Sequence, residues 1–271
     1  YLVKSTDELA RVIHEAFYIA ANGRPGPVLI DIPKDIIMNM GTYVGPEGIE
    51  PRNYNPQISG DRTKIEAAVD MIANAERPII YAGGGVINSG PEASHLLQKF
   101  VKMTGYPCTT TLMALGAYPT TDDQFIGMPG MHGTYEANLA MHGCDIMFNI
   151  GARFDDRVTG NTALFSPNSK KIHIDIDPSS INKNIVVDIA IIGDVTNVLS
   201  DLITIWNQKQ PKLNQNAIEN WWNVIGEWRS ADSLGFEQNF KESIKPQYAL
   251  SQLIKFLDGT DYFVTTDVGQ H

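Results

Sequence analysis

Residues 79–103 read IIYAGGGVINSGPEASHLLQKFVKM and contain the change of pattern that decides the fold. The first four residues form an apolar run of strand length, and Gly83, Gly84 and Gly85 follow it directly. Pro91 then stands where a helix begins, and apolar residues recur at helical spacing as far as Met103. A strand that passes through a glycine loop into a helix is the repeating unit of α/β domains.

The same alternation of strand and helix extends over residues 61–206. Strand-like apolar runs alternate with amphipathic helices of ordinary length, which predicts parallel βαβ units. We therefore expect an α/β fold, with a doubly wound, Rossmann-like parallel sheet covered on both faces. The expected strands are 79–82, 107–112, 145–150, 171–176 and 186–192, and the expected helices are one opened by Asp61, then 91–103, 134–141 and 196–206.

The first 40 residues offer too little apolar surface for a domain of their own. Ser5 and Glu8 predict a capping box for a helix that ends near Asn22. Residues 28–32 predict one short strand, and 41–60 are rich in Pro, Gly and Asn, which predicts an extended linker. We expect residues 1–40 to be the end of a larger domain.

The alternation also breaks after residue 206. Residues 207–245 hold Trp221, Trp222 and Trp228 and predict a helical linker that packs on a neighbour. Residues 246–271 predict a helix opened by Pro246 and a strand at 262–265, as at the start of a further domain. The chain begins at Tyr1 and not at Met, so we expect it to be a piece of a longer protein.

The composition excludes several classes of protein. The chain has 271 residues, 43% hydrophobic and 19% charged, which is ordinary for a globular protein and not for a disordered one. Its formal net charge of −10 argues against a nucleic-acid partner. No apolar run reaches the roughly 18 residues that a membrane span needs. Two cysteines, Cys108 and Cys144, allow at most one disulfide, as in a reducing compartment.

Two segments at strand ends are candidate binding loops. The glycines at 83–85 could approach a phosphate, although Asn88 breaks the dinucleotide fingerprint and a turn alone would also explain them. Residues 151–161 read GARFDDRVTGN, where Arg153 and Arg157 could bind phosphate or carboxylate. The alternative is a solvated loop in which Arg157 pairs with Asp155 or Asp156.

The second loop resembles the GARFDDRVTGN segment of the acetohydroxyacid synthase (acetolactate synthase) catalytic-subunit family. Residues 23–35 (GRPGPVLIDIPKD) resemble the end of that family's pyrimidine-binding domain, and residues 130–133 match its GMHG motif. Residues 265–271 (TTDVGQH) resemble its entry into the pyrophosphate-binding domain. The resemblance covers essentially the whole chain and implies the central FAD-binding domain of a thiamin diphosphate enzyme, with parts of both neighbours.

The resemblance implies where FAD is bound. Arg24 is similar to the arginine on its diphosphate, the glycines at 83–85 to those near the ribityl chain, and 151–158 to a flavin-facing loop. Asp194 would also serve as the N-cap of the helix that follows it. The implied FAD contacts are Arg24, Gly83, Gly84, Gly85, Thr111, Leu112, Met131, His132, Gly151, Ala152, Arg153, Asp155, Val158, Asp175, Ile176, Asp194 and Val195.

The resemblance also implies a substrate residue and places other groups outside this chain. Arg157 is similar to the arginine that recognises the 2-ketoacid, while Pro129 departs from the larger residue expected beside Met131. Gln270 and His271 would lie near thiamin diphosphate. The ylid-forming glutamate and the Mg²⁺ site would lie beyond the two ends, so we expect neither a catalytic residue nor a metal ligand here, and an inactive isolated chain.

The implied activity is decarboxylation of pyruvate and condensation of the two-carbon unit with pyruvate or 2-ketobutyrate, in branched-chain amino acid biosynthesis. The implied partners are a second copy of the chain, in dimers or tetramers, and a regulatory small subunit. We expect a cytoplasmic bacterial protein, and the start at Tyr1 leaves organellar targeting open. The alternatives are a stand-alone flavin- or NAD-binding module and an enzyme of the pyruvate oxidase type.

Overall fold

The computed structural model describes residues 1–43, 45 and 54–265. It divides into two compact units, Tyr1–Arg229 and Ser230–His271, each of which is described by itself.

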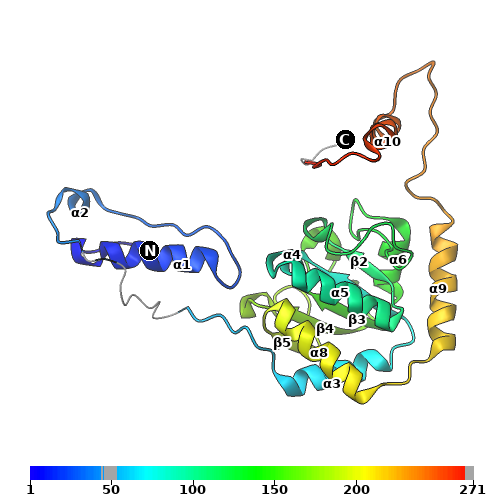
Figure 1. Ribbon diagram of the computed structural model, residues 1–271, viewed down its shortest axis with the longest axis horizontal. Helices are drawn as coiled ribbons and strands as arrows, with labels where there is room; N and C mark the ends of the chain where they lie inside the picture. The colour runs from blue at the N-terminus through cyan, green and yellow to red at the C-terminus, as the bar shows by residue number, and fades with distance from the viewer. Residues whose placement is uncertain (44, 46–53, 266–271) are drawn as a thin grey trace. The chain divides into compact units, whose positions relative to one another are not determined.

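A five-stranded parallel sheet forms the centre of the first unit (Figure 1). Its order, β2-β1-β3-β4-β5, reverses direction between β1 and β3, so the sheet is doubly wound as the sequence predicts. β2 is shorter than expected and β5 begins later, because only these residues pair with a neighbouring strand. The strands are β1 (Pro78–Ala82), β2 (Cys108–Thr110), β3 (Ile146–Ile150), β4 (Lys170–Asp175) and β5 (Ile189–Ile192).

Helices cover both faces of this sheet (Figure 1). α3 (Arg62–Ala73), α5 (Pro91–Thr104) and α8 (Val195–Lys209) bury their apolar stripes on one face. α6 (Tyr135–Gly143) and α9 (Gln215–Arg229) pack on the other. The helix starts follow from local chemistry, since the side chains of Asp61, Thr134 and Asp194 each accept a hydrogen bond from a main-chain N–H of the first turn.

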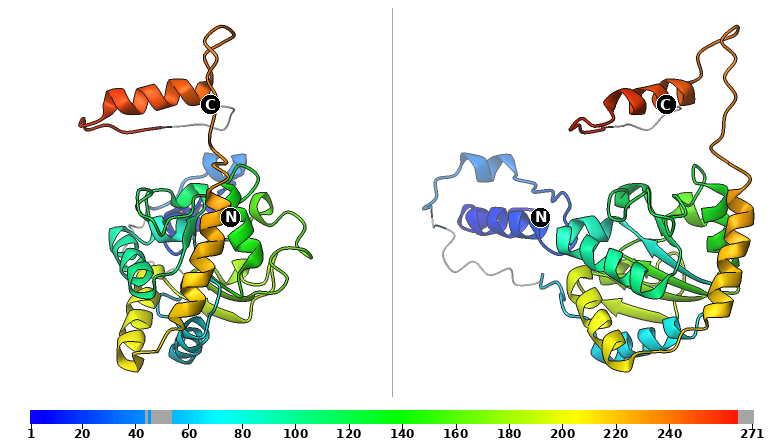
Figure 2. Two further views of the ribbon diagram at one scale, coloured as in Figure 1. Left: turned by 90° about the vertical axis from the view of Figure 1, so that its right-hand side faces the viewer. Right: turned by 45° about the vertical axis from the view of Figure 1, so that its right-hand side comes forward.

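The tryptophan-rich segment packs on the α/β domain through α9, which runs alongside it in Figure 2. Trp221 is buried, and its indole N–H donates to the main-chain oxygen of Pro78 at 3.0 Å. Trp222 donates in the same way to Gly105 at 2.8 Å. These bonds attach the helix at two places, with the Trp228 ring 5.6 Å from that of Trp221.

The N-terminal segment contains η1 (Thr6–Glu8), α1 (Leu9–Ala21) and α2 (Lys34–Met38). The prediction of a strand at 28–32 is wrong, because only a single bridge joins Leu2 to Asp31 and two short segments cannot build a sheet. The predicted capping box is wrong as well. The Ser5 side chain makes no capping bond, and the Glu8 carboxylate instead accepts from the Lys4 N–H.

The described part of the second unit contains α10 (Pro246–Leu257), as predicted from Pro246. Residues 261–265 form no strand, which corrects the expectation for 262–265, since no described strand lies there to pair with them. Cys108 and Cys144 are both free and buried. No helix of the described residues is long and apolar enough to cross a membrane.

Candidate functional site

The loops after β1 and β3 meet at the point where the strand order reverses, which is where doubly wound sheets bind ligands. The Gly83 N–H donates to the Ile150 oxygen at 2.8 Å, and the Gly85 N–H to the Gly151 oxygen at 3.0 Å. A Cβ on Gly83 would lie 2.3 Å from the Gly151 oxygen, and one on Gly85 would lie 2.8 Å from the Gly151 Cα. These glycines are therefore required for the contact between the two loops, whether or not a ligand also uses them.

A short helix that the sequence pattern did not predict begins in the glycine loop. Gly84 begins α4 (Gly84–Asn88), although glycine disfavours helix. A Cβ on Gly84 would lie 3.1 Å from the Met113 side chain, so this glycine too faces a neighbouring loop. The close packing around 83–85 outweighs the unfavourable propensity.

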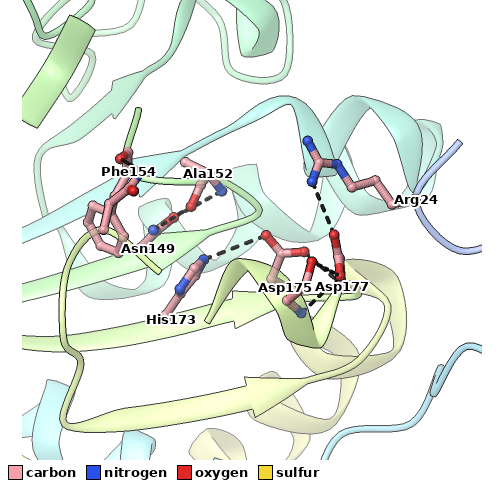
Figure 3. A network of polar contacts seen from close by, with 9 residues as sticks. Arg24, Asn149, Ala152, Phe154, His173, Asp175 and Asp177 are labelled. Atoms are coloured by element: carbon pink, nitrogen blue, oxygen red, sulfur yellow. Dashed lines mark hydrogen bonds and ion pairs between the residues drawn. The ribbon is translucent and has the colours of Figure 1, made fainter. Parts of the chain in front are cut away.

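One side chain shapes the loop after β3. Asn149 is fully buried, its carboxamide N–H₂ donates to the Ala152 oxygen at 2.7 Å, and its oxygen accepts from the Ala152 N–H at 3.0 Å (Figure 3). Gly151 has a φ of +67°, a left-handed conformation that favours glycine. The predicted pair Gly151 and Ala152 is thus held in one turn.

Phe154 anchors the same loop from the other side. It has a φ of +52°, which is uncommon for a residue other than glycine, and its ring is buried. The ring centroid lies 5.2 Å from that of His173 (Figure 3). It lies 6.1 Å from that of Tyr81. Asn184 donates to the Phe154 oxygen at 2.8 Å, so packing and a hydrogen bond together maintain the strained backbone.

The charged residues that follow form α7 (Asp156–Thr159). Asp155 caps it by accepting from the Arg157 N–H at 3.1 Å, and this main-chain bond is the main reason that the pKa of Asp155 lies below its ordinary value. Arg153 pairs with Asp155 at 3.2 Å. The Arg157 guanidinium is three-quarters exposed and 3.9 Å from Asp156, a pair that contributes little stability and leaves most of its donors free.

The GMHG loop lies against α7. The Met131 N–H donates to the Arg157 oxygen at 3.1 Å, and a Cβ on Gly130 would lie 2.7 Å from that oxygen. Asn138 of α6 holds Gly130 as Asn149 holds Ala152, with bonds of 2.8 Å from the Gly130 N–H and 3.0 Å to its oxygen. The Met131 side chain remains 70% exposed.

Comparison with known proteins agrees with this geometry. Residues 65–202, just over half of the chain, match the family model described as thiamine pyrophosphate enzyme, central domain. The chain belongs to this family. The matched residues contain all five strands of the doubly wound sheet.

The relatives of this thiamine pyrophosphate enzyme chain are similar over its whole length. Acetolactate synthase isozyme 3 large subunit of Escherichia coli (strain K12) is 42% identical over 273 residues, which cover 100% of this chain and 47% of that protein. Acetolactate synthase large subunits of Buchnera aphidicola subsp. Acyrthosiphon pisum and of Haemophilus influenzae are 45% and 44% identical, with the same coverage. The chain therefore spans about half the length of the curated relatives it matches.

In this thiamine pyrophosphate enzyme domain a second polar group lies after β4. Arg24 donates to Asp177 at 3.1 Å, and the Asp177 N–H donates to the Asp175 carboxylate at 2.9 Å (Figure 3). Burial would raise the pKa of Asp177, but hydrogen bonds from Ser179 and from Arg24 outweigh it and lower the pKa. The ion pair with Asp177 thus brings Arg24 to the same strand end as Asp175 and Ile176. Asp177 was not among the predicted site residues.

The aspartate after β5 has two roles. One oxygen of Asp194 accepts from the Thr196 N–H at 2.9 Å, so the alternative role as N-cap of α8 is confirmed. The other accepts from the Ser89 hydroxyl at 2.6 Å, which joins the loop before α5 to the start of α8. Val195 is buried in the core, so its side chain does not face solvent at the strand-end edge of the sheet.

Of the remaining predicted positions, some lie beside the glycine loop and others lie elsewhere. Thr111 and Leu112 follow β2, and the Thr111 N–H donates to Ala82 at 2.9 Å, which places them beside the glycine loop. Leu112 is 57% exposed there. Val158 instead lines a cavity of about 220 Å³ between α6 and α7. His132 is exposed in the GMHG loop, while Gln270 and His271 lie outside the described residues.

Sequence reasoning missed the buried polar residues beneath the site. Tyr81, Asn149 and His173 stand in register on β1, β3 and β4, and all three are fully buried. The Tyr81 hydroxyl and the His173 ring nitrogens make no hydrogen bond among the described residues, although Nε2 of His173 lies 3.6 Å from the Asp175 carboxylate (Figure 3). Their only signal was a polar residue inside each of three apolar strands. Within the described residues no three His, Cys, Asp or Glu side chains are placed to hold a metal ion.

Proposed function

We propose that this chain is the central part of an acetolactate synthase catalytic subunit and carries its FAD-binding domain. The observation that carries the proposal is identity of 42–45% to acetolactate synthase large subunits over the whole chain, including the loops on both sides of the switch point. The complete protein would decarboxylate pyruvate and condense the two-carbon unit with pyruvate or 2-ketobutyrate. Residues 1–40 would close the pyrimidine-binding domain and 246–271 would open the pyrophosphate-binding domain.

The residues at the carboxyl ends of the strands suit a dinucleotide that carries a diphosphate. Arg24 supplies a guanidinium that matches phosphate oxygens. Asp175 and Asp194 supply carboxylates, which can accept bonds from ribose hydroxyls. Leu112 and Met131, with 57% and 70% of their surface exposed, offer apolar contact to a flavin ring. The buried Thr111 hydroxyl, which has no partner among the described residues, is a further polar group at this edge.

Arg157 is the residue that we propose for the 2-ketoacid. Its guanidinium is exposed beside the GMHG loop and is only loosely paired with Asp156, so it can form a bidentate contact with a carboxylate. Thiamin diphosphate with Mg²⁺, when bound in the complete protein, supplies the stabilisation of the carbanion. The contribution of the present residues is to hold FAD and to orient the substrate carboxylate.

We further propose that the complete protein acts in the bacterial cytoplasm in branched-chain amino acid biosynthesis, as a dimer or tetramer with a regulatory small subunit. This is the composition implied by the family that the chain resembles. The words "large subunit" in the names of the relatives support a smaller partner.

The test is acetolactate formation from pyruvate by the complete protein, measured as acetoin after acid treatment. We expect formation that requires thiamin diphosphate, Mg²⁺ and FAD, and none from the 271-residue chain under the same conditions. No activity in the complete protein, or purification with bound NAD in place of FAD, would contradict the proposal and favour a nucleotide-binding module.

Flavin binding by the isolated chain provides a second test. Arg24 belongs to the segment before the linker, so we expect its contact to be lost where that segment is not held in place. Loss of one charge-assisted hydrogen bond costs about 1.5–3 kcal/mol, or roughly 10- to 100-fold in affinity. Fluorescence titration that finds equal FAD affinity in the chain and the complete protein would show that this expectation is wrong.

A further inference from the structure

The loop after β3 is held by one carboxamide that the proposed function does not use. Asn149 lies on the central strand of the sheet, has no exposed surface, and uses both its oxygen and its N–H₂ group on the main chain of Ala152. A buried amide without partners is unfavourable, so this side chain is stable only when the loop returns to it. The carboxamide thus favours one conformation of residues 150–152.

This conformation also fixes the residues that follow the turn. Gly151 also donates its N–H to Ile174 at 2.8 Å and accepts from Gly85, so the turn is joined to the strand on one side and to the glycine loop on the other. Arg153 follows Ala152 directly, and its guanidinium pairs with Asp155, which caps α7. A shift of the Ala152 backbone would therefore displace Arg153 and the residues that lead into α7.

We propose that Asn149 is a positioning residue that holds the Gly151–Arg153 turn in the conformation that receives the flavin. The inference rests on the FAD-binding function proposed above. Asn149 itself does not touch the ligand, because it is buried beneath the turn. Its effect on binding passes through the backbone of Ala152 and the direction of Arg153.

The test is Asn149→Leu in the complete protein. Leucine has the same branched arrangement of side-chain heavy atoms as asparagine but is larger and cannot form hydrogen bonds, so the N–H and oxygen of buried Ala152 lose their partners. We expect amide hydrogen exchange of residues 150–155 to rise about 10-fold, and FAD affinity to fall about 10-fold in a fluorescence titration.

Two control variants separate this effect from general destabilisation. Thr104→Val removes a buried hydroxyl that bonds to Phe100 and Val101 at the end of α5, far in sequence from Asn149 and the turn it holds, and should leave FAD affinity within about twofold. Asn138→Leu removes the equivalent pair of hydrogen bonds to Gly130, and should raise amide hydrogen exchange at 128–133 instead of at 150–155.

Each result decides the proposal. Unchanged exchange at 150–155 in Asn149→Leu would overturn it, as would raised exchange with FAD affinity within about twofold of the parent. An equal loss of affinity in Thr104→Val would also overturn it, because instability alone would then explain the effect. If the parent protein binds no FAD, the proposed function fails, and the role of Asn149 toward the ligand fails with it. If the parent binds FAD normally and Asn149→Leu does too, only the role of Asn149 fails.

Discussion

Gly83→Ala tests the claim that the glycine loop is required for the contact between β1 and β3. The new Cβ would lie 2.3 Å from the Gly151 oxygen and 2.5 Å from the Cα of Ala152, where ordinary contact begins at 3.4 Å. Both neighbouring groups are main chain and cannot rotate away. The loops would have to separate by about 1 Å, which breaks the bond of 2.8 Å from Gly83 to Ile150.

The expected loss of stability follows from the steric overlap and from the broken hydrogen bond. Overpacking costs about 1–3 kcal/mol, and the lost hydrogen bond adds about 1 kcal/mol, so the free energy of unfolding should fall by about 2–4 kcal/mol. For a chain of this size the Tm would fall on the order of 10 °C. The φ of Gly83 is −115°, so the effect would not come from backbone conformation.

Circular dichroism during thermal and urea unfolding measures this loss. Gly226→Ala is the matched control, because Gly226 lies inside α9 with nothing within 4 Å of a new Cβ. There alanine should stabilise the helix by about 0.5–1 kcal/mol. A Gly83→Ala protein within about 0.5 kcal/mol of the parent would refute the steric argument, and so would an equal loss in Gly226→Ala.

Three further predictions concern single side chains. In the complete protein Arg157→Ala should raise KM for pyruvate with normal FAD content, whereas Arg153→Ala should lower FAD content with a smaller change in KM; loss of FAD in Arg157→Ala at unchanged KM would assign that residue to the flavin or to a loop ion pair. The pKa of Asp177 is lowered in the folded chain, so its contribution to stability is present above the unfolded pKa and is lost as the pH falls through the folded pKa. Asp177→Asn should therefore flatten the acid side of the stability profile, and so should Arg24→Ala to a smaller degree, while an unchanged profile in urea unfolding between pH 2 and 6 would contradict the assignment. Trp221→Phe should lower the unfolding free energy by about 1–2 kcal/mol, since the buried indole N–H donates to a main-chain oxygen of β1, and an unchanged midpoint in urea would show that α9 does not depend on this bond.

Local chemistry determined the parts of the fold that the sequence could predict. Asp61 and Asp194 cap the helices that they precede, and Pro91 begins α5, because each interaction lies within one turn of chain. The apolar runs that became β1, β3 and β4 were recognisable because a strand buried on both faces needs apolar residues at nearly every position. The same reasoning failed at 28–32 and 262–265, where the run is present but a neighbouring strand is not described.

The site could be located from the sequence only where motifs mark it. The glycines at 83–85 and the loop at 151–158 were recognisable as strand-end segments, and the resemblance assigned them to a flavin. No motif identified Asn149, His173 and Asp177, because the role of a polar residue within or just after a strand cannot be inferred until its partner is known.

By itself, the sequence determined that strands alternate with helices, where most of them begin, and which loops carry glycine and arginine. The tertiary structure alone decided that β1 and β3 are neighbours, that Gly83 and Gly151 therefore touch, and that Asn149 bonds to Ala152 beneath them. The physical reason is range. A cap or a helical stripe involves residues a few positions apart, whereas strand pairing joins segments more than 60 residues apart, from 78–82 to 146–150, and its partners follow from the packing of the whole sheet.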